Sequence, residues 1–82
     1  MPRYYFDCID EAIRHVDEHG VDLRDRHEAA DHAACLVGTM LTEHIPTAGT
    51  RSINVVVRSD DGSTIYVGHG TFHGCPITDD AA

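Results

Sequence analysis

Apolar and polar side chains alternate at the start of the chain. Residues 3–9 are rich in aromatic and β-preferring side chains, a composition typical of a strand. Alternation places Phe6 and Cys8 on one face of this strand and Tyr5 on the other. A weaker pattern predicts a second short strand over residues 12–16. The chain is therefore expected to begin with a pair of strands.

A turn and a helix follow. Gly20 ends an Asp-Glu-His-Gly run and can supply a turn position with positive φ. Asp25, with Glu28 three residues later, resembles a capping box at a helix start. Pro46 prevents the helix from continuing, so the predicted helix covers roughly residues 25–45. Its apolar residues recur with helical spacing: Ala29, Ala30, Ala33, Val37, Met40, Leu41 and Ile45.

The last regular elements are predicted to form a hairpin. Residues 52–58 carry a strong strand pattern, and Asp-Asp-Gly at 60–62 suits a hairpin turn. Residues 63–67 form the returning strand, with Ile65 and Val67 facing inward. Three glycines are expected to weaken any strand beyond this point: Gly68, Gly70 and Gly74.

These elements predict an α+β fold with two layers. The order strand-strand-helix-strand-strand gives a four-stranded, mainly antiparallel sheet with one helix on one face. Residues 1–75 are expected to form a single α+β domain, and residues 76–82 a flexible acidic tail. The predicted core consists of Phe6, Ala33, Val37, Met40, Leu41, Val55, Val57 and Ile65.

Several segments carry a family resemblance. They are Met-Pro-Arg-Tyr-Tyr-Phe-Asp at 1–7, Asp-Glu-His-Gly-Val-Asp-Leu at 17–23, and shorter matches at 32–33, 38–41 and 57–62. They resemble a family of short bacterial proteins classed only as a domain of unknown function. The resemblance covers about residues 1–67 and implies no catalytic or binding residue. The order of elements is also similar to the partial ribonuclease-H-like fold of HicB-type antitoxins, which implies an antitoxin-type regulator as one alternative.

Composition narrows the possible partners. The formal net charge is −8, from 14 acidic residues and six arginines, with no lysine. An acidic surface repels phosphate backbones, so no nucleic-acid partner is expected. The lack of lysine excludes a lysine Schiff base and a P-loop.

No signal peptide and no apolar run of ~20 residues is visible, which favours a cytoplasmic protein without a membrane span. Three cysteines with no zinc or redox spacing are expected to be reduced thiols: Cys8, Cys35 and Cys75.

One group of side chains could bind a metal. His69, His73 and Cys75 share a face if their segment is extended. Imidazole and thiolate suit zinc, nickel or copper. A structural zinc site needs four ligands, and this segment supplies three, so no tight metal site and no cofactor is expected. No catalytic residue is assigned anywhere in the chain, and the other histidines and acids are interpreted as polar surface.

A second group could bind a protein. Tyr5, Val56 and Tyr66 are predicted to point away from the helix, on the uncovered sheet face. A domain this small gains stability by pairing, so a homodimer is expected. The function predicted is a small, soluble, non-enzymatic interaction or regulatory module that self-associates. The alternative is a metal-binding module that uses the His/Cys-rich end of the chain.

Overall fold

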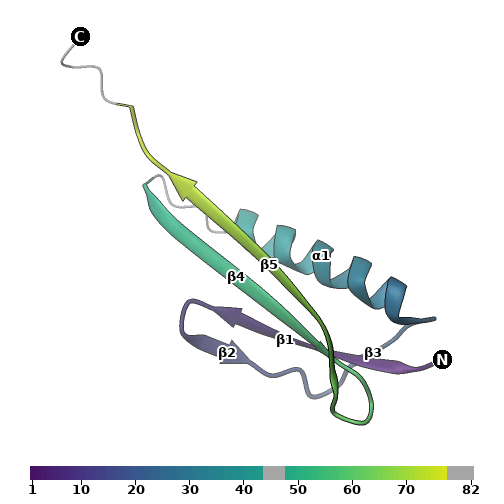
Figure 1. Cartoon of the computed structure of the whole chain (residues 1–82). Coiled ribbons are helices and arrows are strands. Elements are labelled where there is room, and N and C mark those ends of the chain that lie inside the picture. The colour runs from purple at the N-terminus through teal and green to yellow at the C-terminus, as the bar shows by residue number, and fades with distance from the viewer. Residues whose placement is uncertain (44–47, 78–82) are drawn as a thin grey trace.

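Six elements make up the part of the fold that the structure describes. The computed structural model describes residues 1–43 and 48–77. In chain order the elements are β1 (Arg3–Asp10), β2 (Ile13–His15), β3 (Val21–Asp22), α1 (Arg26–Glu43), β4 (Gly49–Arg58) and β5 (Thr64–Gly74). The strand order is β2-β1-β4-β5, with β3 also beside β1, and these pairs are antiparallel. Helix α1 lies against one face of the sheet (Figure 1). The predicted α+β architecture is confirmed, with β3 as an added fifth strand.

The start of α1 follows from its first residues. Glu28 N–H donates to the Asp25 carboxylate at 2.9 Å, and Arg24 N–H donates to the Glu28 carboxylate at 2.7 Å. These are the two reciprocal hydrogen bonds of a capping box, with one difference. Glu28 accepts the N–H of Arg24, one residue before Asp25, and not the N–H of Asp25 itself. The described helix ends at Glu43. The predicted end near Ile45 and Pro46 lies outside the described residues, as does the end of the predicted tail, 78–82.

The core lies between α1 and the sheet. Five of the eight predicted core residues are buried, and the other three, Met40, Leu41 and Ile65, pack against them partly exposed. Sequence analysis left out three further buried hydrophobic residues, Tyr4, Ala29 and Ile53. The two helix alanines, Ala29 and Ala33, have no exposed surface. Small side chains on this stripe let the helix backbone come close to the strands.

Strand β5 is longer than predicted, because its glycines serve the packing of α1. The expectation that Gly68, Gly70 and Gly74 would end regular structure was wrong: β5 pairs with β4 as far as Gly74. A Cβ atom at Gly70 would lie 2.5 Å from Val37 Cγ1 and 2.7 Å from Leu41 Cδ1. Gly70 is therefore a position where side chains of α1 pack directly against the backbone of the strand.

A β-bulge changes which side chains of β5 face the helix. Arg58 pairs with Thr64 and Val57 with Tyr66, so β5 has one extra residue, Ile65. Cross-strand partners point to the same side of a sheet. Tyr66 therefore shares the helix side with buried Val57, and the prediction that it faces away was wrong. Alternation counted from the hairpin turn cannot detect an inserted residue, which reverses the facing of every later side chain.

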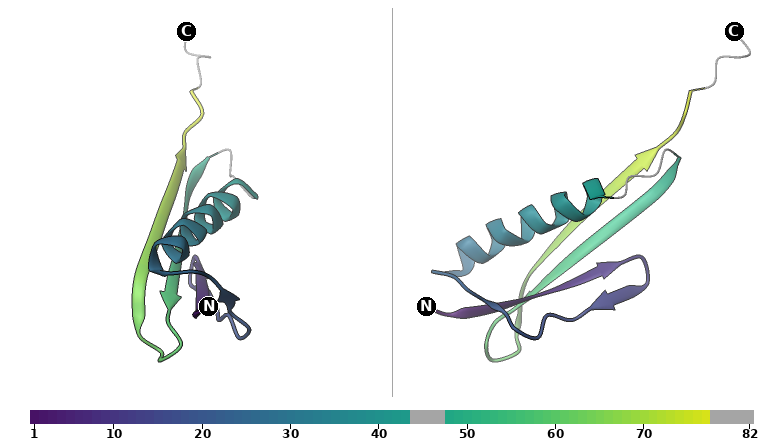
Figure 2. Two further views of the ribbon diagram at one scale, coloured as in Figure 1. Left: turned by 90° about the vertical axis from the view of Figure 1, so that its right-hand side faces the viewer. Right: turned by 180° about the vertical axis from the view of Figure 1, so that it is seen from behind.

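The side of the sheet opposite α1 is called the far face below. Figure 2 shows α1 on one side of the sheet and β5 at its rim. Val67, not Tyr66, pairs with Val56 on the far face. None of the helices in the described part of the chain is long and apolar enough to span a membrane.

Candidate functional site

A buried carboxylate organises the far face. Asp7 on β1 is 1% exposed. It accepts hydrogen bonds from Arg58 Nε at 2.8 Å, from Arg14 Nη2 at 2.9 Å and from the backbone N–H of Asp17 at 3.0 Å. Arg58 also lies over the Tyr5 ring, 5.0 Å from its centroid. These contacts join β1, β2, β4 and the loop after β2.

The acidity of Asp7 follows from its partners. Burial by itself raises the pKa of a carboxyl group. Hydrogen bonds from Arg58, the Asp17 N–H and Arg14 exceed that effect and lower the pKa of Asp7 to about 2. The side chain is therefore ionised at neutral pH and paired with two arginines. Such a group holds segments together and does not exchange protons near pH 7.

Asp17 closes a gap in the sheet. Between β2 and β3 the backbone N–H of Phe6 has no strand partner, and the Asp17 carboxylate accepts it at 3.1 Å. The same carboxylate accepts the N–H groups of His19 and Gly20. Burial opposes ionisation of Asp17, but the hydrogen bonds from Gly20, Phe6 and His19 outweigh it and lower its pKa. Gly20 has φ of 76°, as its turn position requires.

Sequence analysis missed this network. It predicted no contact between Asp7, Asp17 and Arg58. The available signal was Asp7 itself, an acid inside an aromatic strand, because a carboxylate in such a segment needs cationic or N–H partners when it is buried. The partners are 10 and 51 residues away along the chain, and alternation alone cannot identify them.

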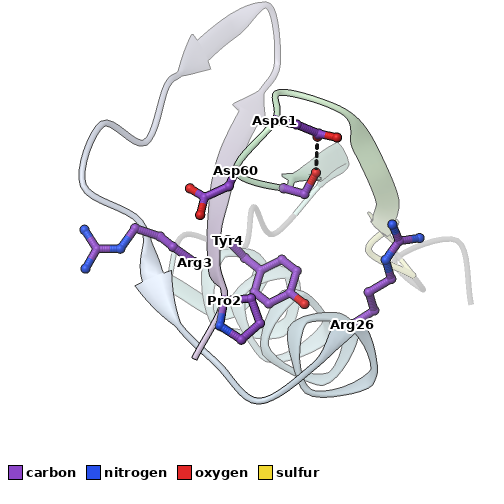
Figure 3. Close-up of a pocket in the computed structure, with 7 residues that line it drawn as sticks. Pro2, Arg3, Tyr4, Arg26, Asp60 and Asp61 are labelled. Carbon is purple, nitrogen blue, oxygen red and sulfur yellow. Dashed lines mark hydrogen bonds between the residues drawn. The ribbon is translucent and has the colours of Figure 1, made fainter.

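A pocket opens at the opposite end of the sheet from Gly74. Its volume is about 320 Å³, and it is lined by Pro2, Arg3, Tyr4, Arg26, Ser59, Asp60 and Asp61 (Figure 3). Two of its charged groups are held by protein partners. Arg3 pairs with Asp22 at 2.9 Å. The hydroxyl of Ser59 and the N–H of Ser63 donate to Asp61, which lowers its pKa to about 2. None of the predicted site residues lines this pocket.

The histidines of β5 belong to polar pairs on the far face. His69 Nδ1 lies 2.8 Å from Asn54 Oδ1, and its Nε2 lies 2.8 Å from the Thr71 hydroxyl. His73 Nδ1 lies 2.7 Å from the Thr50 hydroxyl. Each histidine is therefore oriented by a side chain of the neighbouring strand β4 or of β5 itself.

Within one chain the predicted metal ligands do not come together. His69, His73 and Cys75 lie along one extended segment, with β5 ending at Gly74. A strand rises about 3.3 Å per residue, which puts His69 and His73 roughly 13 Å apart. No group of three or more His, Cys, Asp or Glu side chains in residues 1–43 and 48–77 is arranged to hold a metal. All three cysteines are free, with Cys35 and Cys75 exposed and Cys8 half-buried. Burial raises the pKa of Cys8.

The two rims of the sheet differ in length and in charge. At one rim β2 and β3 are three and two residues long, with Asp17 between them. At the other rim β5 is 11 residues long, and β4 is its one partner strand in the described structure. Residues 62–78 contain no Asp, Glu or Arg. The strand at this rim thus exposes a long, uncharged row of backbone donors and acceptors.

Comparison with known proteins identifies the family. A family model described as "Domain of unknown function (DUF6894)" matches residues 3–70, and the chain belongs to this family. The resemblance to a domain of unknown function is thereby confirmed. No curated protein and no solved structure matches the chain.

Proposed function

We propose that this member of the family is a non-enzymatic, self-associating module, and that a second copy pairs with it along the open rim of β5. The single observation that carries the proposal is the contrast between the two rims of the sheet. Antiparallel pairing of β5 with its own copy would join two sheets into one. In this proposal the protein has no catalytic role and acts as an interaction or regulatory module by pairing with a second copy.

Natural proteins protect the edges of their sheets. Short strands, charged side chains, proline and bulges prevent unintended pairing. The rim formed by β2 and β3 has such protection: its strands are short, Arg14 and Asp22 lie on them, and Asp17 accepts the Phe6 N–H. Strand β5 has one bulge at its start and no charged residue. Its open edge is consistent with a partner strand.

The distribution of charge favours contact between two copies at this rim over contact at other surfaces of the chain. Each chain carries a net charge of −8, so two copies repel each other. Pairing along β5 brings no carboxylate of residues 62–78 into the contact, since that segment has none. The remaining long-range repulsion is screened by salt. We therefore expect the dimer to tighten as the salt concentration rises from 20 to 300 mM, values chosen to span a Debye length of roughly 20 to 6 Å.

Sedimentation equilibrium with matched variants tests the proposal. Val67 and Thr71 both lie exposed on β5, and Val67→Lys/Thr71→Lys adds two charges to its open rim. Ile13→Lys adds a charge to the opposite rim, at a side chain that is 62% exposed. Lysines reduce the net negative charge, which by itself would favour association. We expect the β5 variant to be monomeric and the β2 variant to dimerise at least as well as the wild type.

Circular dichroism of each variant verifies folding. A wild-type protein that stays a monomer at millimolar concentration and 300 mM salt would refute the proposal. A dimer that withstands the β5 substitutions but dissociates with Ile13→Lys would place the contact at the rim formed by β2 and β3. That result would also refute the proposal.

A further inference from the structure

We propose that pairing along β5 creates a zinc site between two copies, formed by His69 of one copy and by His73 and Cys75 of the other. This inference rests on the proposed function, since one chain cannot assemble the site alone. By symmetry the dimer would contain two such sites. The ligand class is a borderline-soft divalent metal ion, with zinc as the expected occupant.

The pairing geometry restricts which residues can meet. Two copies that continue one sheet are related by a two-fold axis perpendicular to that sheet. Directly opposite residues then share a face, so the axis passes beside a single residue of β5. With Thr71 on the axis, His69 lies opposite His73 of the second copy, and His73 lies opposite its His69.

The position of α1 favours Thr71 as the centre. Leu41 packs over Gly70, and the described helix ends at Glu43. The ends of β4 and β5 project beyond the helix (Figure 1). Both helices of the pair lie on the same side of the joined sheet, so pairing through the projecting end keeps them apart. The bulge at Ile65 also interrupts the ladder at the other end of β5.

The distances within this pair suit one metal ion. Opposite residues of antiparallel strands have Cβ atoms about 4.5–5.5 Å apart, and diagonal neighbours about 7–8 Å. Cys75 follows His73 by two residues and comes directly after the end of β5 at Gly74. In the proposed pair it continues the strand, lies on the same side as His73 and is diagonal to His69 of the other copy. Imidazole nitrogen and thiolate bind zinc at about 2.0 and 2.3 Å. Two histidines and one cysteine leave the fourth position for water.

The hydrogen bonds of both histidines already orient them as ligands. An amide oxygen accepts only, so His69 Nδ1 carries the proton and donates to Asn54 Oδ1. Its Nε2 lone pair then accepts from the Thr71 hydroxyl, an exposed contact that a metal ion can replace. His73 is held through Nδ1 by the Thr50 hydroxyl, so Nε2 is the ring nitrogen that this contact does not use. Metal-binding histidines are commonly fixed in this way through the nitrogen that does not bind the metal.

A complementation experiment tests whether the site is shared between copies. His69→Ala removes one ligand from both sites of its dimer, and His73→Ala/Cys75→Ser removes the other two ligands from both. In a mixed dimer one site loses all three ligands and the other keeps all three. We expect zinc to tighten the wild-type dimer at least tenfold, with two zinc ions per dimer. Each variant alone should lose this effect, and the equimolar mixture should regain it with one zinc ion per mixed dimer.

The measurement is sedimentation equilibrium in a thiol-free reductant, with EDTA or with zinc chloride, and metal content is determined after gel filtration. His15→Ala serves as the control, because His15 lies on the opposite rim, and it should respond to zinc as the wild type does. A mixture that fails to regain the zinc effect would overturn the inference.

The EDTA arm separates this inference from the proposed function. A dimer that forms equally well in EDTA and in zinc supports pairing along β5 and overturns the zinc site. A monomer under both conditions overturns both. Zinc bound at one ion per monomer, without tighter association, also overturns the shared site.

Discussion

Asp7→Asn tests the buried network most directly. The substitution keeps the shape of the side chain and removes the charge that Arg58 and Arg14 share. The pKa of Asp7 falls from 3.8 to about 2 in the folded protein. A difference of roughly two pKa units corresponds to about 2–3 kcal/mol of stability.

A second route gives a similar magnitude. Removing one partner of a fully buried ion pair costs about 3–5 kcal/mol. The Arg58 and Arg14 side chains are 26% and 52% exposed, so water can solvate them again after the substitution. We therefore expect Asp7→Asn to lower the free energy of unfolding by about 2–3 kcal/mol at pH 7. For a domain of this size that is a fall in melting temperature of roughly 8–24 °C.

The stability that Asp7 contributes should change with pH in a definite direction. The folded-state pKa of Asp7 is depressed, so its stabilisation is present above the unfolded value of 3.8 and is lost as pH falls towards 2. The difference between wild type and Asp7→Asn should therefore be constant from pH 7 to about 5 and should shrink between pH 4 and 2. Thermal unfolding followed by circular dichroism measures it. Asp22→Asn is the control, because its ion pair with Arg3 is half exposed, and solvent screening makes the contribution of such a pair to stability much smaller than that of Asp7. Equal losses for both variants, or a difference independent of pH, would refute the reasoning.

Four further substitutions test the packing of α1, each by urea denaturation. Gly70→Ala should cost about 1–3 kcal/mol, because the new methyl group would overlap Val37 and Leu41. Gly68→Ala places its Cβ at an ordinary 3.4 Å and should cost less; the reverse order would contradict the helix position. Gly38→Ala lies in the helix with open space around it and should stabilise by about 0.5–1 kcal/mol; a loss would contradict its exposure. Val37→Asp should destabilise by several kcal/mol, because it buries an unpaired carboxylate; near-wild-type stability would disprove the core assignment.

Local patterns in the sequence were enough to predict the elements and most of the core. Aromatic and β-branched residues predicted β1 and β4, and the spacing of Ala33, Val37 and Leu41 predicted α1. These signals depend on neighbours within a few residues. The short strand β3 was not predicted, because two residues carry too little pattern.

The remaining differences arise from contacts between distant segments. Glycine in a strand normally argues against regular structure, but Gly70 is required by the approach of α1, a tertiary effect. The bulge at Ile65 reversed the facing of Tyr66 relative to the count from the turn. The role of Asp7 depends on Arg58 from another strand. The metal-ligand pattern at His69 and His73 was visible in sequence, whereas the strand spacing that separates them became clear from the structure.

For a chain that pairs along β5 as proposed, the carboxylate of Asp17 helps to limit how far assembly can proceed. A sheet with one open rim can join a single further sheet, and the result is a closed pair with no rim left to extend. A sheet open at both rims can add copies at each end and grow into a filament. By accepting the Phe6 N–H in place of a neighbouring strand, Asp17 removes an unpaired donor from a rim whose strands β2 and β3 are already short and charged. Together these features would keep a chain that associates through β5 from growing beyond a pair.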